Sequence, residues 1–136
     1  MDIEEFAKNF IEAEAEAFHK GNFEPLSRIE NPNIVYHMPP LPDMVGHKAT
    51  SRTLRGRLRQ YQILTQEWKY LAGDGNIFAL SYKSGGRVTG EKPGFPIPIG
   101  KKIATDYLFV LQVKNGKIAE AWANGTFKTD LGIAPE

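Results

Sequence analysis

The sequence of 136 residues contains no cysteine, so disulfide bonds and thiolate chemistry are excluded. It also has no apolar run long enough to span a membrane, and its acidic, amphipathic start (MDIEEFAKNF) is unlike a signal peptide. Neither sign of charge is in excess, because 17 lysines and arginines stand against 16 acids, for a formal net charge of +1. We therefore expect a cytoplasmic protein that binds neither nucleic acid nor a membrane surface.

Motifs for metals and cofactors are missing as well. The three histidines, His19, His37 and His47, stand on different expected elements and have no spacing typical of a metal site. The glycines lack the spacing of a Rossmann or phosphate-binding loop. We therefore expect neither a metal nor a cofactor.

The pattern of apolar residues predicts a mixture of helices and strands in one domain over residues 1–136. Helices are predicted from Asp2, as the cap, to Gly21, and over 25–29 and 48–61. Strands are predicted at 34–38, 63–71, 77–84, 103–113 and 118–124. The last two strands should form a hairpin, because Asn115-Gly116 between them tolerates the positive φ angles of a tight turn.

The predicted strand 103–113 is apolar on both faces, which is typical of a strand that is covered on both sides. Its Asp106 shares a face with Leu108 and Val110. A carboxylate that points into an apolar interior is costly, and active sites are where such groups are kept. A strand-end aspartate that reaches water is the alternative.

His37 lies where a short predicted strand meets the proline-rich segment 39–46. A histidine at such a rim can act as a general acid or base, because its ordinary pKa lies near neutrality. The alternative is a histidine bonded to backbone or water. A second glycine- and proline-rich segment, 84–102, is expected to form a flap over a cavity or an arm that reaches a partner subunit.

Large side chains share faces of two other predicted strands: Leu64, Trp68 and Tyr70 on the first, and Phe78, Leu80 and Tyr82 on the second. Such rows form either a core or the wall of a pocket. Trp68 and Tyr82 also carry polar groups that can meet a ligand.

The order of elements resembles the nuclear transport factor 2-like superfamily, in particular its SnoaL-like, polyketide-cyclase-like branch. The resemblance is carried by NPNIVYHMPP, by Gly46 before the third helix, and by PIPIGKKI, NGKIAEAW and LGIAP. It implies an α+β, cystatin-like fold: a cone-shaped barrel whose strongly bent, mainly antiparallel sheet is wrapped by three N-terminal helices around a ligand cavity. It also implies a homodimer through the outer sheet face, which would explain the two apolar faces of 103–113.

The resemblance does not decide the function, because this fold serves cyclases, isomerases, dehydratases, epoxide hydrolases and non-catalytic modules. The cyclase-like branch carries an aspartate just beyond the tryptophan of its last strand. Here Trp122 is followed by no acid before Asp130, which counts against an aldol-type cyclisation. Steroid-isomerase-like members place an acid on the strand before the final hairpin. Asp106 shares the strand face of that position but lies about one strand step earlier in the sequence.

Two hypotheses remain open. In the first, a hydrophobic carbonyl compound enters the cone, His37 or Asp106 moves a proton at carbon, and Tyr82 or Trp122 donates a hydrogen bond to the developing oxyanion. Isomerisation, dehydration and cyclisation would all fit. In the second, the cavity binds a ligand without catalysis or is partly plugged, and the protein is a dimeric interaction module. The predicted substrate-binding residues are Tyr36, Trp68, Tyr82, Trp122 and Asn124.

Overall fold

The computed structural model describes residues 2–39, 42–90 and 98–129. Its helices are α1 (Ile3–Lys20), α2 (Glu24–Ile29) and α3 (His47–Gln60). Its strands are β1 (Glu30–His37), β2 (Met44–Val45), β3 (Tyr61–Asp74), β4 (Ile77–Val88), β5 (Lys102–Lys114) and β6 (Lys117–Thr129). None of the helices in these ranges is both long enough and apolar enough to cross a membrane.

The first helix begins and ends as its sequence predicts. The Asp2 carboxylate accepts hydrogen bonds from the backbone N–H groups of Glu4 and Glu5, at 3.1 and 3.2 Å. Gly21 ends the helix with a φ of 67°, a left-handed conformation that glycine adopts without a side-chain clash. The apolar stripe of the helix, which includes Phe10, is buried against the sheet.

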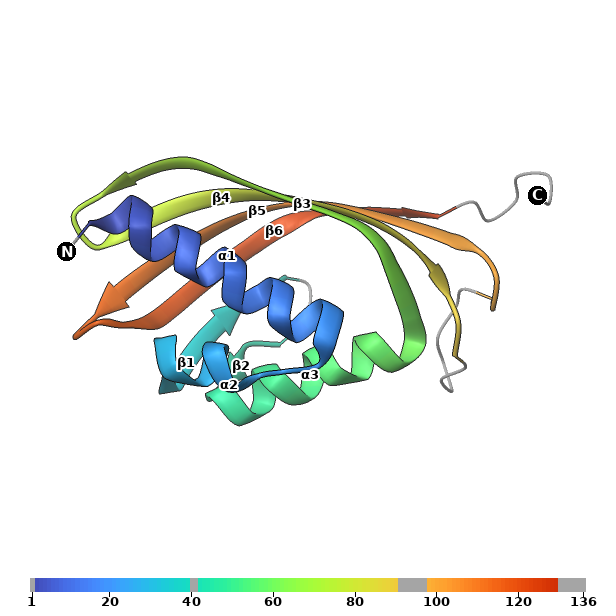
Figure 1. Ribbon diagram of the computed structural model, residues 1–136, viewed down its shortest axis with the longest axis horizontal. Coiled ribbons are helices and arrows are strands. Elements are labelled where there is room, and N and C mark those ends of the chain that lie inside the picture. The colour runs from blue at the N-terminus through green and yellow to red at the C-terminus, as the bar shows by residue number, and fades with distance from the viewer. Residues whose placement is uncertain (1, 40–41, 91–97, 130–136) are drawn as a thin grey trace.

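The six strands form one sheet in the order β2-β1-β6-β5-β4-β3. All neighbours are antiparallel except β1 and β6. The long strands arch over the three helices, and β3 bends down to meet the end of α3 (Figure 1). The expected α+β fold, a strongly bent and mainly antiparallel sheet with N-terminal helices on one side, is confirmed. We call the side that faces the helices concave and the other side convex.

The core lies between the helices and the concave face of the sheet. Residues Phe109, Leu111 and Val113 of β5 point into it, as do alternate residues of β4 and β6. The other face of β5 is not covered within the chain, because Leu108 is 57% and Val110 37% exposed. The expectation that both faces of this strand are covered is therefore not met by the monomer.

Several predicted strand ends are wrong, and β6, for example, runs to Thr129 rather than to residue 124. The first strand starts at Glu30 rather than residue 34, and a register shift against β6 lies between Glu30 and Val35. The fourth strand continues to Val88, so the start of the expected loop 84–102 is a paired strand. Gly86 permits this pairing, because a Cβ there would overlap the backbone carbonyl of Gln62 in the neighbouring strand. The centre of the expected flap, 91–97, lies outside the described residues.

Candidate functional site

Aromatic side chains gather between α1 and the concave face of the sheet. We define this aromatic cluster as Phe10, Phe18, Trp68, Tyr82 and Phe109. Trp68 and Tyr82 lie opposite each other in the pairing of β3 with β4, and their ring centroids are 4.3 Å apart. Phe109 of β5 and Phe10 of α1 lie 5.4 and 5.8 Å from the Trp68 ring, and Phe18 stacks on Tyr82 at 6.1 Å. Five rings from four elements thus form a continuous, largely apolar wall.

The aromatic cluster carries two polar groups. The indole N–H of Trp68 is buried and has no hydrogen-bond partner among the described residues. The side-chain amide of Gln66 donates to the hydroxyl of Tyr82 at 3.0 Å. An unpaired buried donor costs about 1–3 kcal/mol, and native proteins hold few of them. The Trp68 N–H is therefore a buried donor without an acceptor among the described residues.

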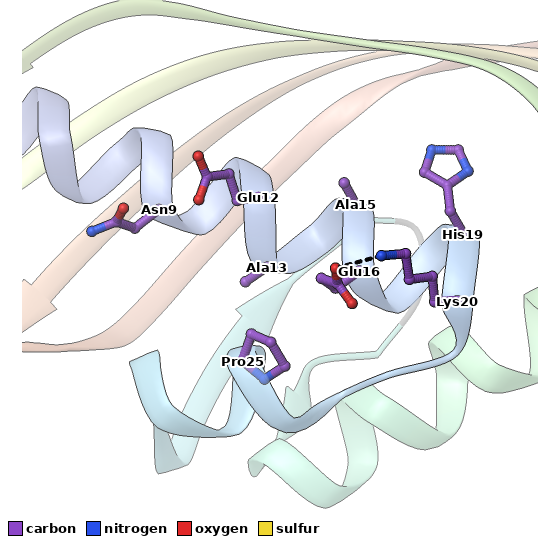
Figure 2. Close-up of a pocket in the computed structure, with 8 residues that line it drawn as sticks. All are labelled: Asn9, Glu12, Ala13, Ala15, Glu16, His19, Lys20 and Pro25. Carbon is purple, nitrogen blue, oxygen red and sulfur yellow. Dashed lines mark hydrogen bonds and ion pairs between the residues drawn. The ribbon is translucent and has the colours of Figure 1, made fainter.

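A surface pocket of about 510 Å³ lies elsewhere, along α1 and beside α2 (Figure 2). Its lining consists of Asn9, Glu12, Ala13, Ala15, Glu16, His19, Lys20 and Pro25. Glu16 accepts a hydrogen bond from Lys20 at 3.1 Å, and this bond lowers the pKa of its carboxyl group. The polar side chains point in different directions instead of converging, and none of the predicted site residues lines the pocket.

His37 lies at the end of β1 on the convex face, between two carboxylates. Its Nδ1 is 2.9 Å from Asp43 and its Nε2 is 2.6 Å from Glu120. Its ring also stacks on Trp122, with centroids 5.5 Å apart. The hydrogen bond to Glu120, followed by the one to Asp43, raises the pKa of His37. An imidazolium that donates from both nitrogens ties three segments together, and it has no free nitrogen with which to act as a base.

The sheet divides the predicted site residues into two groups. Tyr36, Trp68 and Tyr82 point to the concave side, where each is at least partly buried. His37, Trp122, Asn124 and Asp106 point to the convex side, since Trp122 and Asn124 pair with the exposed Val110 and Leu108.

Of the two positions considered for Asp106, interior or exposed to water, the structure shows the exposed one. The residue is exposed, and its neighbours across the sheet are Lys83 and Thr126. Because Tyr107 and Phe109 turn toward the helices, the alternation of the strand sends Asp106 to the opposite face. It shares that face with Leu108, as predicted, but the shared face is the convex one.

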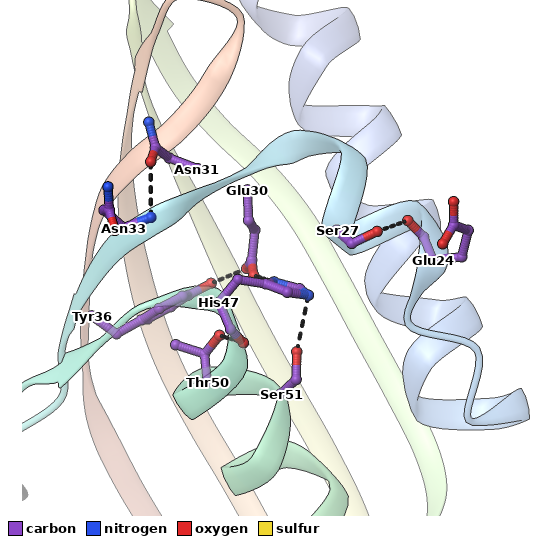
Figure 3. A network of polar contacts seen from close by, with 9 residues as sticks. All are labelled: Glu24, Ser27, Glu30, Asn31, Asn33, Tyr36, His47, Thr50 and Ser51. Atoms are coloured by element: carbon purple, nitrogen blue, oxygen red, sulfur yellow. Dashed lines mark hydrogen bonds and ion pairs between the residues drawn. The ribbon is translucent and has the colours of Figure 1, made fainter.

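A polar network that was not predicted lies under β1 (Figure 3). The Nδ1 atom of His47 is 2.6 Å from a carboxylate oxygen of Glu30, and the Nε2 atom is 3.1 Å from the hydroxyl of Ser51. Tyr36 donates to the other oxygen of Glu30 at 3.4 Å. Glu30 is only 3% exposed, and this burial raises the pKa of its carboxyl group.

Part of this network had a sequence signal. His47 and Ser51 are four residues apart at the start of a predicted helix, a spacing that puts both side chains on one face. Glu30 gave no such signal, because it lies 17 residues from His47 on another element. In the described part of the chain, no three histidine, aspartate or glutamate side chains are grouped so that they could hold a metal ion.

A comparison with protein families matches residues 11–121 to one profile, described as the SnoaL-like domain. This range spans most of the chain and includes α2, α3 and all of β1 to β5. A comparison with curated proteins found no match.

Solved structures share the fold at low sequence identity. A candidate SnoaL-like polyketide cyclase from Mesorhizobium loti is 22% identical, with a TM-score of 0.69 over 91% of this chain and 99% of that one. A candidate hydroxylase from Streptomyces galilaeus is 19% identical, with a TM-score of 0.72 over 90% and 89%. A protein with a cystatin-like fold from Xanthomonas campestris is also 19% identical, with a TM-score of 0.65 over 93% and 92%. At these identities the likeness shows the fold alone.

Proposed function

The chain belongs to the SnoaL-like domain family, and from this premise we propose that residues 1–136 form one domain that binds a hydrophobic small molecule on the concave side of its sheet. The observation that carries the proposal is the buried indole N–H of Trp68, which has no partner among the described residues. A ligand with a carbonyl or similar acceptor would receive this hydrogen bond. The surrounding rings of the aromatic cluster would contact its apolar part.

The energetics favour this ligand chemistry. A donor that stays unpaired in an apolar wall costs about 1–3 kcal/mol, and an acceptor that enters with the ligand removes this cost. A wall of aromatic rings suits a ligand that is itself planar or cyclic. Hydrophobic ketones, lactones and polyketide-like aromatic compounds have both properties.

The proposed function is ligand binding, and no reaction is assigned to it. The residues predicted to move a proton, His37 and Asp106, lie on the convex face, whereas the Trp68 donor lies on the concave face. His37 is also held between two carboxylates, so it does not offer a free base to a ligand on either side.

A fluorescence titration tests the binding site. The Trp122→Phe variant keeps Trp68 as its only tryptophan, so ketones, lactones, polyketide-like aromatics and steroids can each be titrated against Trp68 emission. A bound ligand should also raise the melting temperature by mass action. The proposal is refuted if no compound class changes either signal.

The matched pair Trp68→Phe and Trp122→Phe tests the hydrogen bond. Both changes keep an aromatic ring and remove an indole N–H, but only the first does so in the aromatic cluster. Loss of one buried hydrogen bond should weaken binding by about 1–2 kcal/mol, or roughly five- to thirtyfold in Kd. Trp122→Phe should leave the melting-temperature shift unchanged, and equal losses in the two variants would contradict the assignment.

The proposal extends to a homodimer through the convex face. Leu108 and Val110 are exposed there beside Ile77, which is 39% exposed, and a second copy of the chain would cover this apolar surface. Light scattering should then give twice the mass of the chain at micromolar concentration, and Leu108→Glu should give a monomer. A wild-type protein that is monomeric under these conditions would rule out the dimer.

A further inference from the structure

The Glu30–His47–Ser51 chain has the contacts of a nucleophile, a base and an orienting acid. The His47 ring lies between the Ser51 hydroxyl, 3.1 Å from Nε2, and the Glu30 carboxylate, 2.6 Å from Nδ1 (Figure 3). Each partner uses a different ring nitrogen. This is the order of contacts by which a histidine takes a proton from a hydroxyl group while a carboxylate holds its tautomer.

Donors and acceptors can be assigned consistently to all the hydrogen bonds of the network. Glu30 can only accept when it is ionised, so the Nδ1–H of His47 donates to one oxygen and the Tyr36 hydroxyl donates to the other. The neutral imidazole then carries no proton on Nε2, which leaves this nitrogen to accept from the Ser51 hydroxyl. Every polar atom in the network has a partner in this arrangement.

Glu30 is the most buried of the three residues. The side chain of Glu30 is 4% exposed and that of His47 is 18% exposed, whereas Ser51 is partly exposed. The orienting acid is thus shielded from water, whereas His47 and Ser51 are only partly buried.

We propose that Ser51 is an activated nucleophile that accepts acyl groups from small activated esters, with His47 as its base and Glu30 as the residue that positions His47. Ser51 Oγ forms a bond to the carbonyl carbon while His47 Nε2 takes the hydroxyl proton. The bond from that carbon to the alcohol oxygen then breaks, and His47 returns the proton to the departing alcohol. Water repeats these steps on the acyl-serine, which releases the acid and restores Ser51.

This activity does not depend on ligand binding by the aromatic cluster. Ser51 and His47 lie on α3, and Glu30 lies at the start of β1. None of the three belongs to the aromatic cluster. Failure of the Trp68 titration would therefore leave the Ser51 proposal intact, and failure of serine acylation would leave the ligand site intact.

The test uses two probes on the full chain. A fluorophosphonate labels activated serines irreversibly, and 4-nitrophenyl acetate gives a burst of nitrophenolate with an acetylated protein that intact mass detects. Peptide mapping of the wild-type protein should place both labels on Ser51. This result requires no variant, so misfolding cannot obscure it. A wild-type protein that stays unlabelled at Ser51 overturns the proposal.

Variants distinguish a nucleophilic Ser51 from a Ser51 that only makes a structural hydrogen bond to His47. Ser51→Ala should lose the label, and His47→Gln should slow labelling by about 100-fold or more, the usual contribution of a general base. Ser27→Ala is the matched control, because Ser27 donates to the backbone of Glu24 and contacts no histidine, and its labelling should equal wild type. Circular dichroism checks that each variant is folded. Labelling of Ser51 that persists unchanged in folded His47→Gln overturns the role of His47 and with it the proposal.

Discussion

Replacing Glu30 by alanine is expected to lower the free energy of unfolding by about 2–4 kcal/mol, because two hydrogen bonds to one buried carboxylate are lost. Glu30 is 3% exposed and accepts hydrogen bonds from Tyr36 and from His47. Its removal leaves both donors without an acceptor, at about 1–3 kcal/mol each. Tyr36 is 7% exposed, so water replaces the lost acceptor there only in part.

Glutamine at the same position should cost less, about 1–2 kcal/mol, because its carbonyl oxygen still accepts one of the two bonds. The cost should also depend on pH. Burial raises the pKa of Glu30 in the folded protein above its ordinary value of 4.5. A group whose pKa is raised by folding contributes its full stability below the unfolded pKa and loses it as pH rises through the folded pKa. The difference in free energy of unfolding between wild type and Glu30→Gln should therefore be largest at acidic pH and decrease toward neutral pH.

Urea unfolding followed by circular dichroism measures these differences at several pH values. Glu24→Ala is the matched control, because Glu24 is paired with Arg28 on the surface, where its side chain is 64% exposed, and the loss should be below about 0.5 kcal/mol. A loss below about 1 kcal/mol for Glu30→Ala, or equal losses for alanine and glutamine, would refute the account of the network.

Three further outcomes are expected. The hydrogen bond to Glu120 raises the pKa of His37 in the folded protein. The contribution of His37 to stability should therefore be full below a pH of about 6.5, the unfolded value, and should be lost as pH rises through the folded pKa. Urea unfolding of His37→Gln should lack this pH dependence. Gly86→Ala should lower stability by about 2 kcal/mol or more, because the new Cβ overlaps the backbone of Gln62. Gly85→Ala should cost less, because its Cβ would meet only one side-chain atom, the Thr65 hydroxyl oxygen at 2.9 Å. Equal midpoints of urea unfolding for the two variants would contradict this. Asp106→Asn should leave ligand-induced shifts in melting temperature unchanged, because the residue lies on the exposed convex face, and a changed shift would place the ligand there.

Most elements of the fold could be predicted because their signals are local. Asp2 and Gly21 bound the first helix through their own backbone and side-chain chemistry, and Asn115-Gly116 closes the last hairpin with φ angles of 53° and 77°. The resemblance then supplied how these pieces are arranged, and the bent sheet confirms it. The site was predicted less well. Trp68 and Tyr82 do lie together, as their shared faces indicated, whereas the sequence left open whether Asp106 is interior or exposed, and it is exposed.

Alternation along a strand shows which residues share a face, and an amphipathic pattern shows which face of a helix is buried. Neither shows which side of a strand that is apolar on both faces turns toward the helices. In β5 the curvature of the sheet and the position of α1 decided which face turns toward the helices, and Asp106 lies on the other, convex face. Likewise, His37 meets Glu120 across 83 residues of sequence, and His47 meets Glu30 across 17. Local sequence chemistry thus determined the elements and their ends, whereas contacts between distant residues, which depend on how the sheet bends and pairs, arose only in the tertiary structure.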